Sequence, residues 1–305
     1  MFEKKIPLEE LIEDLNDKFK GALSVYGLLK QKKPIINNIG SFKVPKHLEQ
    51  HYKKRKSFLE DISNYKNRMN HNEPHLVLKE EFHFGPYLEL DCLLTDYAAC
   101  KTMRIDANEE FQLITGNALV WCSKTKQVVF QIREERDIDW SPGQSTIFGG
   151  GFLPVSVNDK RIDQSIFDNI DREFREETGD IVHLQKLRTS PILVTKEHLV
   201  HDSQKTGSIQ FNALGAEIPK DAIGELRPTW EGGIDYINKN DLVSNFDNKK
   251  WTPFAVASTL VWLNQSDLGL FERFYNSYTE KSFEDLLGFS RNAIGLFNEA
   301  HKIFD

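Results

Sequence analysis

The chain has 305 residues, 39% of them hydrophobic and 28% charged, which is enough apolar material for a core and excludes global disorder. Its 46 acidic residues outnumber its 39 basic ones, and the net charge of -7 argues against a uniformly basic nucleic-acid-binding surface. Three cysteines without a CxxC pair argue against a disulfide scaffold or a thiolate zinc site and suit a reducing compartment. The N-terminus has no apolar stretch of signal-peptide length, and the longest near-apolar run, residues 253–263, is too short to span a bilayer, so we expect a soluble, cytoplasmic protein.

The first eighty residues are predicted to form a helical N-terminal extension. In residues 8–19, Leu8, Leu11, Leu15 and Phe19 recur at helical spacing. A second helix is predicted over residues 47–69, where basic side chains are frequent. We therefore place a first, helical region at residues 1–80.

Residues 81–250 change to the pattern of strands and turns. Apolar and polar residues alternate, and glycine and proline mark the turns between the apolar runs. The predicted strands lie within residues 82–94, 118–132, 145–151, 190–195, 208–216 and 234–242. From residue 251 the pattern is helical again, beginning with the apolar stretch 253–263, so residues 251–305 are predicted to be a helical C-terminal segment.

One helix stands out between the predicted strands. Ser165 is a good N-cap residue, and Gly179 supplies the left-handed residue that commonly ends a helix. Phe167, Ile170 and Phe174 fall on one stripe and predict a buried face. The helix is therefore expected to pack on the sheet and to carry its polar residues on the opposite side.

The same helix carries three glutamates at helical spacing. Glu173, Glu176 and Glu177 fall at i, i+3 and i+4, so their carboxylates share one face. Oxygen ligands of this kind suit Mg²⁺, which binds carboxylates and bridges to substrate phosphates. Arg172 lies four residues before Glu176, within pairing distance, and is expected to orient a carboxylate. The pattern predicts a site for Mg²⁺ or Mn²⁺.

The segment from Arg172 to Gly179 resembles the core of the Nudix box, G-x5-E-x7-R-E-U-x-E-E-x-G-U, where U is a bulky apolar residue. The resemblance implies an α/β fold, with an α/β/α sandwich around a mixed sheet. It also implies metal-dependent hydrolysis of a nucleoside diphosphate linked to another moiety. Arg172 matches the orienting arginine, and Glu173, Glu176 and Glu177 match the metal-binding and base-positioning glutamates. The glycines of STIFGGGF resemble the element before the box, so Gly150 and Gly151 are expected to contact substrate.

The sequence departs from the motif before the helix. Eight residues before Arg172, where the family has a glutamate, this chain has Gln164, and the preceding loop is longer. These departures and the flanking helical segments leave a second hypothesis open. A non-catalytic module of the same fold would bind a nucleotide and engage a partner through its helical flanks.

The substrate and the general base stay open. ADP-ribose, dinucleotides, sugar nucleotides and capped RNA all fit the implied reaction, although binding to nucleic acid in general is not expected. Glu197, Glu217 and Glu231 lie in later segments that could supply a base, and Glu231 is favoured as an extra base or ligand. No membrane partner is expected, and a homodimer is one role open to the flanking helices.

Overall fold

The strands of the described residues form one large mixed sheet and a small hairpin. The computed structural model describes residues 5–30, 34–66, 72–85, 87–107, 109–133, 144–154, 163–198, 200–201, 204–205, 207–229, 232–282 and 285–286. The strands are β1 (Leu23–Leu28), β2 (Ile35–Ser41), β3 (Pro74–Leu78), β4 (Glu89–Asp96), β5 (Leu113–Cys122), β6 (Gln127–Arg133), β7 (Ser145–Thr146), β8 (Phe148–Gly151), β9 (Ile192–Glu197), β10 (Val200–His201), β11 (Gln204–Lys205), β12 (Ser208–Glu217) and β13 (Gly232–Asn238).

The large sheet runs in the order β1-β9-β12-β5-β3-β4-β2. The β12–β5 and β2–β4 pairs are parallel and the other neighbours antiparallel, so the sheet is mixed as predicted. Strand β8 also pairs with β5, and β6 pairs with β5, β7 and β13. Three strands of the main order come from the region predicted to be helical, and β3 lies next to β5 at the centre.

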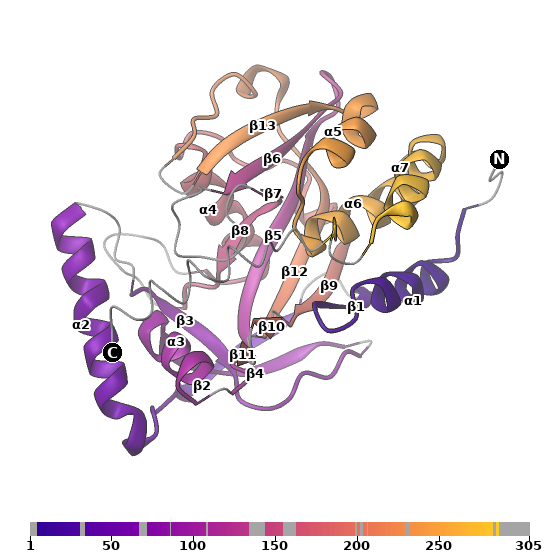
Figure 1. Ribbon diagram of the computed structural model, residues 1–305. Helices are drawn as coiled ribbons and strands as arrows, with labels where there is room; N and C mark the ends of the chain where they lie inside the picture. The colour runs from indigo at the N-terminus through magenta and orange to yellow at the C-terminus, as the bar shows by residue number, and fades with distance from the viewer. Residues whose placement is uncertain are drawn as a thin grey trace.

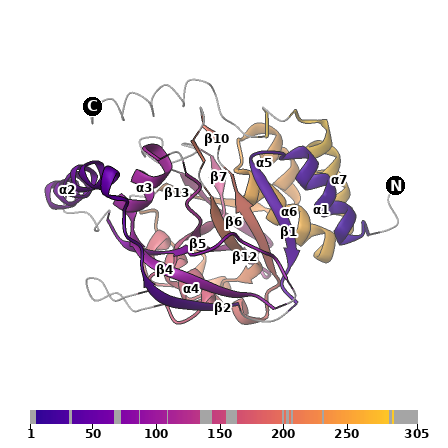
Figure 2. The same ribbon diagram turned by 90° about the horizontal axis from the view of Figure 1, so that it is seen from below.

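Helices cover both faces of this sheet. They are α1 (Leu8–Lys18), α2 (Glu49–Lys66), α3 (Tyr97–Ile105), α4 (Ile166–Thr178), α5 (Leu242–Asn248), α6 (Pro253–Ser266) and α7 (Leu268–Glu280). Figure 1 and the view from below in Figure 2 show α1, α6 and α7 gathered at one side of the molecule and α2 at the other. None of the described helices has the combination of length and apolar character needed to span a bilayer.

Alternation along β5 separates the two layers of the core. Ala118 and Val120 belong to the apolar cluster that contains Phe174 of α4. Leu119, between them, points to the other face and joins the cluster that contains Leu260 of α6. The sheet is thus packed between α4 and α6, and the predicted α/β/α arrangement around a mixed sheet is confirmed.

The two ends of the chain share one core. Phe19, which follows α1, lies with its ring centroid 6.0 Å from that of Tyr278 in α7, and both are fully buried. The side-chain amide of Asn264 in α6 donates a hydrogen bond to the carbonyl of Ile6. The predicted domain boundaries at residues 80 and 250 stay a prediction, and the part of the predicted helical C-terminal segment from residue 287 onward lies outside the described residues.

Candidate functional site

Helix α4 forms where its caps predict it. The hydroxyl of Ser165 accepts a hydrogen bond from the backbone N–H of Asp168, and Gly179 ends the helix with a φ of 93°. Phe174 packs edge to face on Phe148 of β8, with ring centroids 5.1 Å apart. The apolar stripe thereby fixes the rotation of the helix and turns Arg172 and its neighbouring glutamates toward β8.

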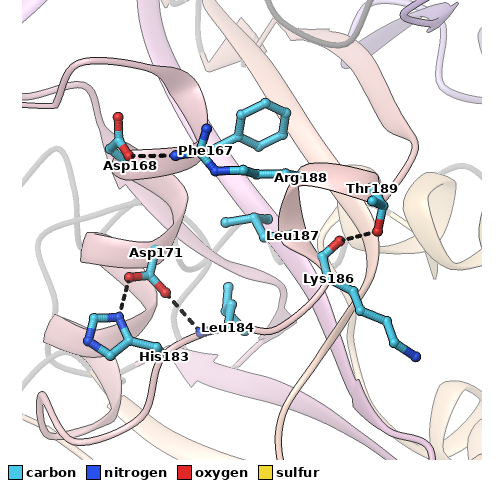
Figure 3. A pocket seen from close by; sticks show the side chains of 9 residues that line it. All are labelled: Phe167, Asp168, Asp171, His183, Leu184, Lys186, Leu187, Arg188 and Thr189. Carbon is cyan, nitrogen blue, oxygen red and sulfur yellow. Dashed lines mark hydrogen bonds and ion pairs between the residues drawn. The ribbon is translucent and has the colours of Figure 1, made fainter.

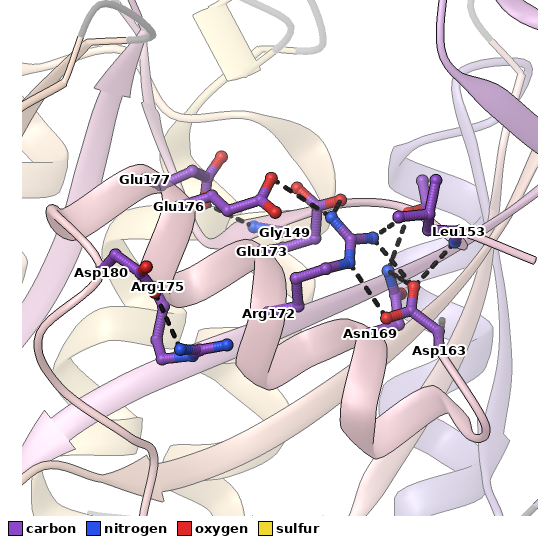
Figure 4. A network of polar contacts seen from close by, with 11 residues as sticks. Gly149, Leu153, Asp163, Asn169, Arg172, Glu173, Arg175, Glu176, Glu177 and Asp180 are labelled. Carbon is purple, nitrogen blue, oxygen red and sulfur yellow. Dashed lines mark hydrogen bonds and ion pairs between the residues drawn. The ribbon is translucent and has the colours of Figure 1, made fainter. Parts of the chain in front are cut away.

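Arg172 is the centre of the polar network on this helix (Figure 4). Its guanidinium is 6% exposed and donates to both carboxylate oxygens of Asp163, at 3.0 and 2.9 Å, and to the carbonyl of Gly151 at 2.8 Å. Its Nη1 lies 2.8 Å from Glu173 Oε1 and 3.3 Å from Glu176 Oε2. Every side of the guanidinium plane therefore faces an oxygen, which holds the two glutamates in fixed orientations.

The charge of Arg172 is secured by this environment. Burial alone would lower the pKa of the guanidinium, but the negative charges of Glu173, Asp163 and Glu176 together raise its pKa above the ordinary value. Arg172 is thus a permanent cation at the base of the cluster. It offsets the mutual repulsion of carboxylates that sequence spacing places on one helix face.

The three glutamates of the motif do not point the same way. The side chains of Glu173 and Glu176 are 13% and 16% exposed and lie beside Arg172. Glu177 is buried; it accepts hydrogen bonds from the backbone N–H of Gly149 at 2.9 Å and from the side-chain amide of Gln131 at 3.0 Å. The structure therefore brings together Arg172, Glu173 and Glu176, and ties Glu177 to the glycine strand.

The glycines of β8 lie directly against these groups. A Cβ atom added to Gly150 would lie 2.4 Å from Glu173 Oε2, and one added to Gly151 would lie 2.3 Å from His75 Nδ1. Only the missing side chains let the Glu173 carboxylate and the His75 ring come so close to the strand. The spaces beside Gly150 and Gly151, predicted as substrate contacts, are therefore small cradles lined by a carboxylate and an imidazole.

The residues present fit a hard divalent cation through oxygen ligands. Among the residues that the structure describes, no group of three or more His, Cys, Asp or Glu side chains could hold a metal ion as it stands. Mg²⁺ is commonly bound by one or two carboxylates, with waters and substrate phosphates completing its shell. Glu173 and Glu176 meet that requirement, because both are partly exposed and both contact Arg172. Glu173 also lies against Gly150.

Asp163 is the residue that sequence reasoning missed. Motif spacing aligned Gln164 with the family's glutamate, but Gln164 is exposed and its neighbour Asp163 is buried. Besides its two bonds to Arg172, Asp163 accepts hydrogen bonds from the backbone N–H of Leu153 at 2.7 Å and from the side chain of Asn169 at 3.2 Å. The carboxylate that contacts Arg172 is thus one residue before Gln164, which counting along the motif could not reveal.

His75 was missed as well, because it comes from a region predicted to be helical. It lies on β3, and its Nδ1 is a buried atom with no hydrogen-bond partner among the described residues. Burial lowers the pKa of His75 to about 4, so the ring is neutral at neutral pH. A neutral imidazole beside Gly151 adds a hydrogen-bonding group to the neighbourhood of Arg172.

The candidate bases from later segments fall in three different places. Glu231 lies outside the described residues. Glu217 ends β12 and pairs with Lys186 at 2.8 Å, away from Arg172. Glu197 ends β9 partly buried, and burial raises its pKa to about 7 against the opposing charges of Arg133 and Arg104. The pKa of Glu197 therefore lies in the range useful for exchange of protons near neutral pH.

A separate cavity of about 330 Å³ lies on the outer side of α4, against residues 183–189. Figure 3 shows Asp171 facing the ring of His183 and the backbone of Leu184, while Arg188 lies across the ring of Phe167. His183 Nδ1 and Asp171 Oδ2 are 2.7 Å apart. These contacts hold the loop after α4 against the helix. They do not involve Arg172, Glu173 or Glu176.

Comparisons with known proteins add partial likenesses. No protein-family model and no curated protein matches the chain. Among solved structures it is similar to a bifunctional NMN adenylyltransferase/ADP ribose pyrophosphatase from Francisella tularensis, at 17% identity and a TM-score of 0.37 over 54% of this chain and 45% of that one. It is similar to a MutT protein from Methanosarcina mazei Go1, at 18% identity and a TM-score of 0.33 over 57% and 99%. A MutT NUDIX hydrolase from Burkholderia pseudomallei matches at 14% identity and a TM-score of 0.32 over 48% and 96%.

Proposed function

We propose that the chain is a hydrolase that uses Mg²⁺ or Mn²⁺ to cleave the pyrophosphate bond of a nucleoside diphosphate linked to another moiety. The observation that supports this proposal is the pairing of Glu173 and Glu176 with one buried cation, Arg172, beside a strand of glycines. A structural ion pair does not need two carboxylates for one guanidinium that already has Asp163. Carboxylate oxygens gathered at one point of a helix are the ligands that a hard divalent cation takes, which favours a site for such a cation here.

Each residue of the cluster has a distinct part in the proposed site. Glu173 and Glu176 would hold the metal ion, with Arg172 fixing both carboxylates and Asp163 fixing Arg172. When bound, the ion supplies charge neutralisation of the diphosphate and acidifies a water molecule. Glu177 positions β8 through the N–H of Gly149. That Glu177 is also a metal ligand stays a prediction.

The glycine strand gives the substrate its room. Gly150 and Gly151 are partly exposed and carry no side chain, so a diphosphate can approach the backbone beside Glu173. A carboxylate close to the attacking water must accept its proton, and the cluster offers this group without further movement of the chain. The proposed metal ligands, a carboxylate that can accept a proton and the accessible backbone of Gly150 and Gly151 thus lie close together, as hydrolysis of a phosphoanhydride requires.

Turnover of a small panel tests this proposal. ADP-ribose, a dinucleotide, a sugar nucleotide and capped RNA are incubated with the protein and Mg²⁺ or Mn²⁺, and the products are separated and identified. Glu173→Gln combined with Glu176→Gln should lower turnover by at least about a hundredfold. Asp180→Asn is a matched control, because that carboxylate is 70% exposed at the end of the same helix. Equal turnover by the double variant would contradict the proposed site.

The alternative is a nucleotide-binding module without activity, and it is motivated by Gln164, the longer loop and the flanking helical segments. The contact of Asp163 with Arg172 weakens the first of these reasons and leaves the other two. It predicts nucleotide binding by calorimetry with no product from any compound of the panel. The same samples therefore separate the two functions.

A further inference from the structure

A chain of side-chain hydrogen bonds crosses three strands on the sheet face opposite α4. The amide of Asn117 on β5 donates to Asn212 Oδ1 on β12 at 2.8 Å, and the amide of Asn212 donates to Thr195 Oγ1 on β9 at 3.0 Å. The hydroxyl of Thr195 donates back to Gln210 Oε1 on β12 at 2.8 Å. The amide of Gln210 then donates to Glu197 Oε2 on β9 at 3.4 Å.

Every donor in this chain points toward Glu197. Bonds aligned in one direction polarise one another, so the chain strengthens the final bond to the Glu197 carboxylate. The four donors Asn117, Asn212, Thr195 and Gln210 are all buried. Burying amides and hydroxyls is costly unless each is hydrogen-bonded, whereas apolar side chains would fill the same sheet positions without that cost. Packing alone therefore gives no reason for the chain.

The chain lies between two apolar cores on the same face of the sheet. At one end of β5, Leu113 joins the apolar cluster that contains Met103 of α3, and toward the other end Leu119 joins the cluster that contains Leu260 of α6. Thr115 and Asn117 occupy the positions between them and face the same way. A polar strip, formed by Thr115, Asn117, Asn212, Thr195, Gln210 and Glu197, thus separates the two apolar cores on this face of the sheet. It passes the point where β8 pairs with β5.

The strip begins at the proposed hydrolytic site. Gly149 pairs with Asn117 and Gly151 pairs with Thr115, so β8 covers this part of the strip with backbone only. The N–H of Gly149 is also the group that holds Glu177. From β8 across β5 and β12 to β9 there are three strand spacings of about 4.8 Å, or roughly 14 Å in all. Glu197 therefore lies at the far end of the strip from β8.

Glu197 is the far end of the strip and is partly exposed to solvent. It is the last residue of β9 and only partly buried, unlike the four side chains that lead to it. Arg133 and Arg104 are near enough for their charges to oppose the effect of burial on its pKa. The amide of Gln210 donates to one oxygen of the Glu197 carboxylate and so orients the group, and the other oxygen can accept a hydrogen bond from a bound molecule.

We propose that Glu197 accepts hydrogen bonds from N–H or O–H donors of the nucleoside and that Asn117, Asn212, Thr195 and Gln210 position it for this contact. This inference rests on the proposed function, since it assigns the specificity subsite of the same site. The donor is either a ring or amino N–H of the base or a hydroxyl of the ribose. Glu197 thereby sets substrate affinity and takes no part in the bond-breaking step.

Calorimetric binding of nucleoside monophosphates tests the subsite independently of turnover. AMP, GMP, CMP and UMP are titrated into the wild-type protein, and the tightest binder into Glu197→Gln. Loss of a charged acceptor should weaken binding by about 10- to 100-fold. Ribose 5-phosphate and the 2′,3′-dideoxy form of the same nucleotide tell whether the base or the ribose supplies the donor. Equal binding of the best nucleotide by Glu197→Gln would overturn the proposal.

Thr195 tests the positioning chain without touching the ligand. Thr195→Val removes the hydroxyl that accepts from Asn212 and donates to Gln210, while Thr195→Ser keeps it. Thr195→Val should weaken nucleotide binding toward the level of Glu197→Gln, and Thr195→Ser should stay within about threefold of the wild type. Thermal unfolding of each variant, together with its binding of inorganic phosphate, separates this effect from a loss of fold. If both Thr195 variants weaken nucleotide binding alike, the hydroxyl does not position Glu197 and the chain has no such role.

Turnover then separates this inference from the proposed function. With a hydrolysed substrate, Glu197→Gln should raise KM by about 10- to 100-fold and leave kcat within about threefold. A large fall in kcat with unchanged nucleotide binding would make Glu197 a proton acceptor and overturn the subsite. If the wild type hydrolyses nothing but loses nucleotide binding on Glu197→Gln, the subsite stands and the proposed hydrolysis fails.

Discussion

The carboxylate of Asp163 and the guanidinium of Arg172 meet through two parallel hydrogen bonds, Nε to Oδ1 at 3.0 Å and Nη2 to Oδ2 at 2.9 Å. Both side chains are almost fully buried, so the pair is protected from screening by solvent and salt. The same carboxylate accepts the N–H of Leu153. One acidic residue therefore joins the loop after β8 to the helix that carries the glutamates.

Asp163→Asn should be the damaging substitution and Gln164→Glu the neutral one, although the motif alone would make position 164 the important one. Asparagine has the size of Asp163 but removes the negative charge that faces the buried guanidinium of Arg172. The loss should lower the free energy of unfolding by about 3 kcal/mol and should also lower turnover. Gln164→Glu introduces a glutamate at the exposed position that counting along the motif selects, and should change stability by less than about 0.5 kcal/mol. Urea unfolding of both variants checks this. A stable Asp163→Asn protein beside a Gln164→Glu protein with raised activity would contradict the assignment.

Arg172→Gln and Arg175→Gln provide a matched pair on one helix. Arg172 is buried among three carboxylates, and its removal leaves Asp163 and Glu173 without their cation, so we expect a loss of about 3–5 kcal/mol. Arg175, whose side chain is 27% exposed, pairs with Asp180 near solvent and should cost less than about 1 kcal/mol. Urea denaturation at a fixed salt concentration measures both. Similar losses for the two variants would show that the buried network does not stabilise the fold.

The part of the site that could be predicted from sequence is the part that local pattern determines. Ser165, the apolar stripe and Gly179 define α4 within a single stretch of chain, and the structure has the helix from Ile166 to Thr178. Asp163 escaped because a loop has no periodicity, and counting along the motif placed Gln164 in the role. Only the folded position of the loop shows which of two neighbouring polar residues turns inward.

The strands of the first eighty residues could not be predicted for a different reason. β3 is five residues long and gains its partners, β4 and β5, from later parts of the chain. A short strand of this kind is stabilised by its neighbours, and its own sequence carries little signal. The place of His75 beside Gly151 and the chain of hydrogen bonds that ends at Glu197 could therefore not be predicted, because each depends on which strands lie side by side.

Two neighbouring glycines of β8 should differ sharply when replaced by alanine. Gly149 has a φ of +152°, and an added Cβ would lie 2.3 Å from the backbone oxygen of Gly116, so Gly149→Ala should cost about 3 kcal/mol or more. At Gly150 the nearest atoms to the added Cβ belong to the carboxylate of Glu173, which can move aside at the expense of its contact with Arg172. Gly150→Ala should therefore fold with a loss under about 1 kcal/mol but show at least about tenfold lower metal-dependent turnover. Full activity in Gly150→Ala would argue against the cradle.

His75 and Glu197 should give stability slopes of opposite sign between pH 5 and pH 7. The pKa of His75 is about 4 in the folded protein against an ordinary 6.5, so the unfolded chain binds more protons there and stability falls as the pH is lowered from 6.5. The pKa of Glu197 is about 7 against 4.5, so the folded chain binds more protons and stability falls as the pH rises toward 7. Each slope is at most about 1.4 kcal/mol per pH unit.

Urea unfolding at several pH values separates the two groups. His75→Gln should remove the loss of stability on acidification, and Glu197→Gln should remove the loss on raising the pH. If neither variant changes the dependence on pH, these side chains do not have the buried environments described here.

Binding of Mn²⁺ followed by electron paramagnetic resonance tests most directly whether the glutamates of α4 gather a divalent cation. The free-ion signal is titrated with wild-type protein, with the Glu173→Gln and Glu176→Gln double variant, and with Asp180→Asn. We expect the wild type and Asp180→Asn to reduce the free signal equally and the double variant to bind at least about a hundredfold more weakly. Equal binding by all three proteins, or none by the wild type even with a nucleotide diphosphate present, would contradict the account.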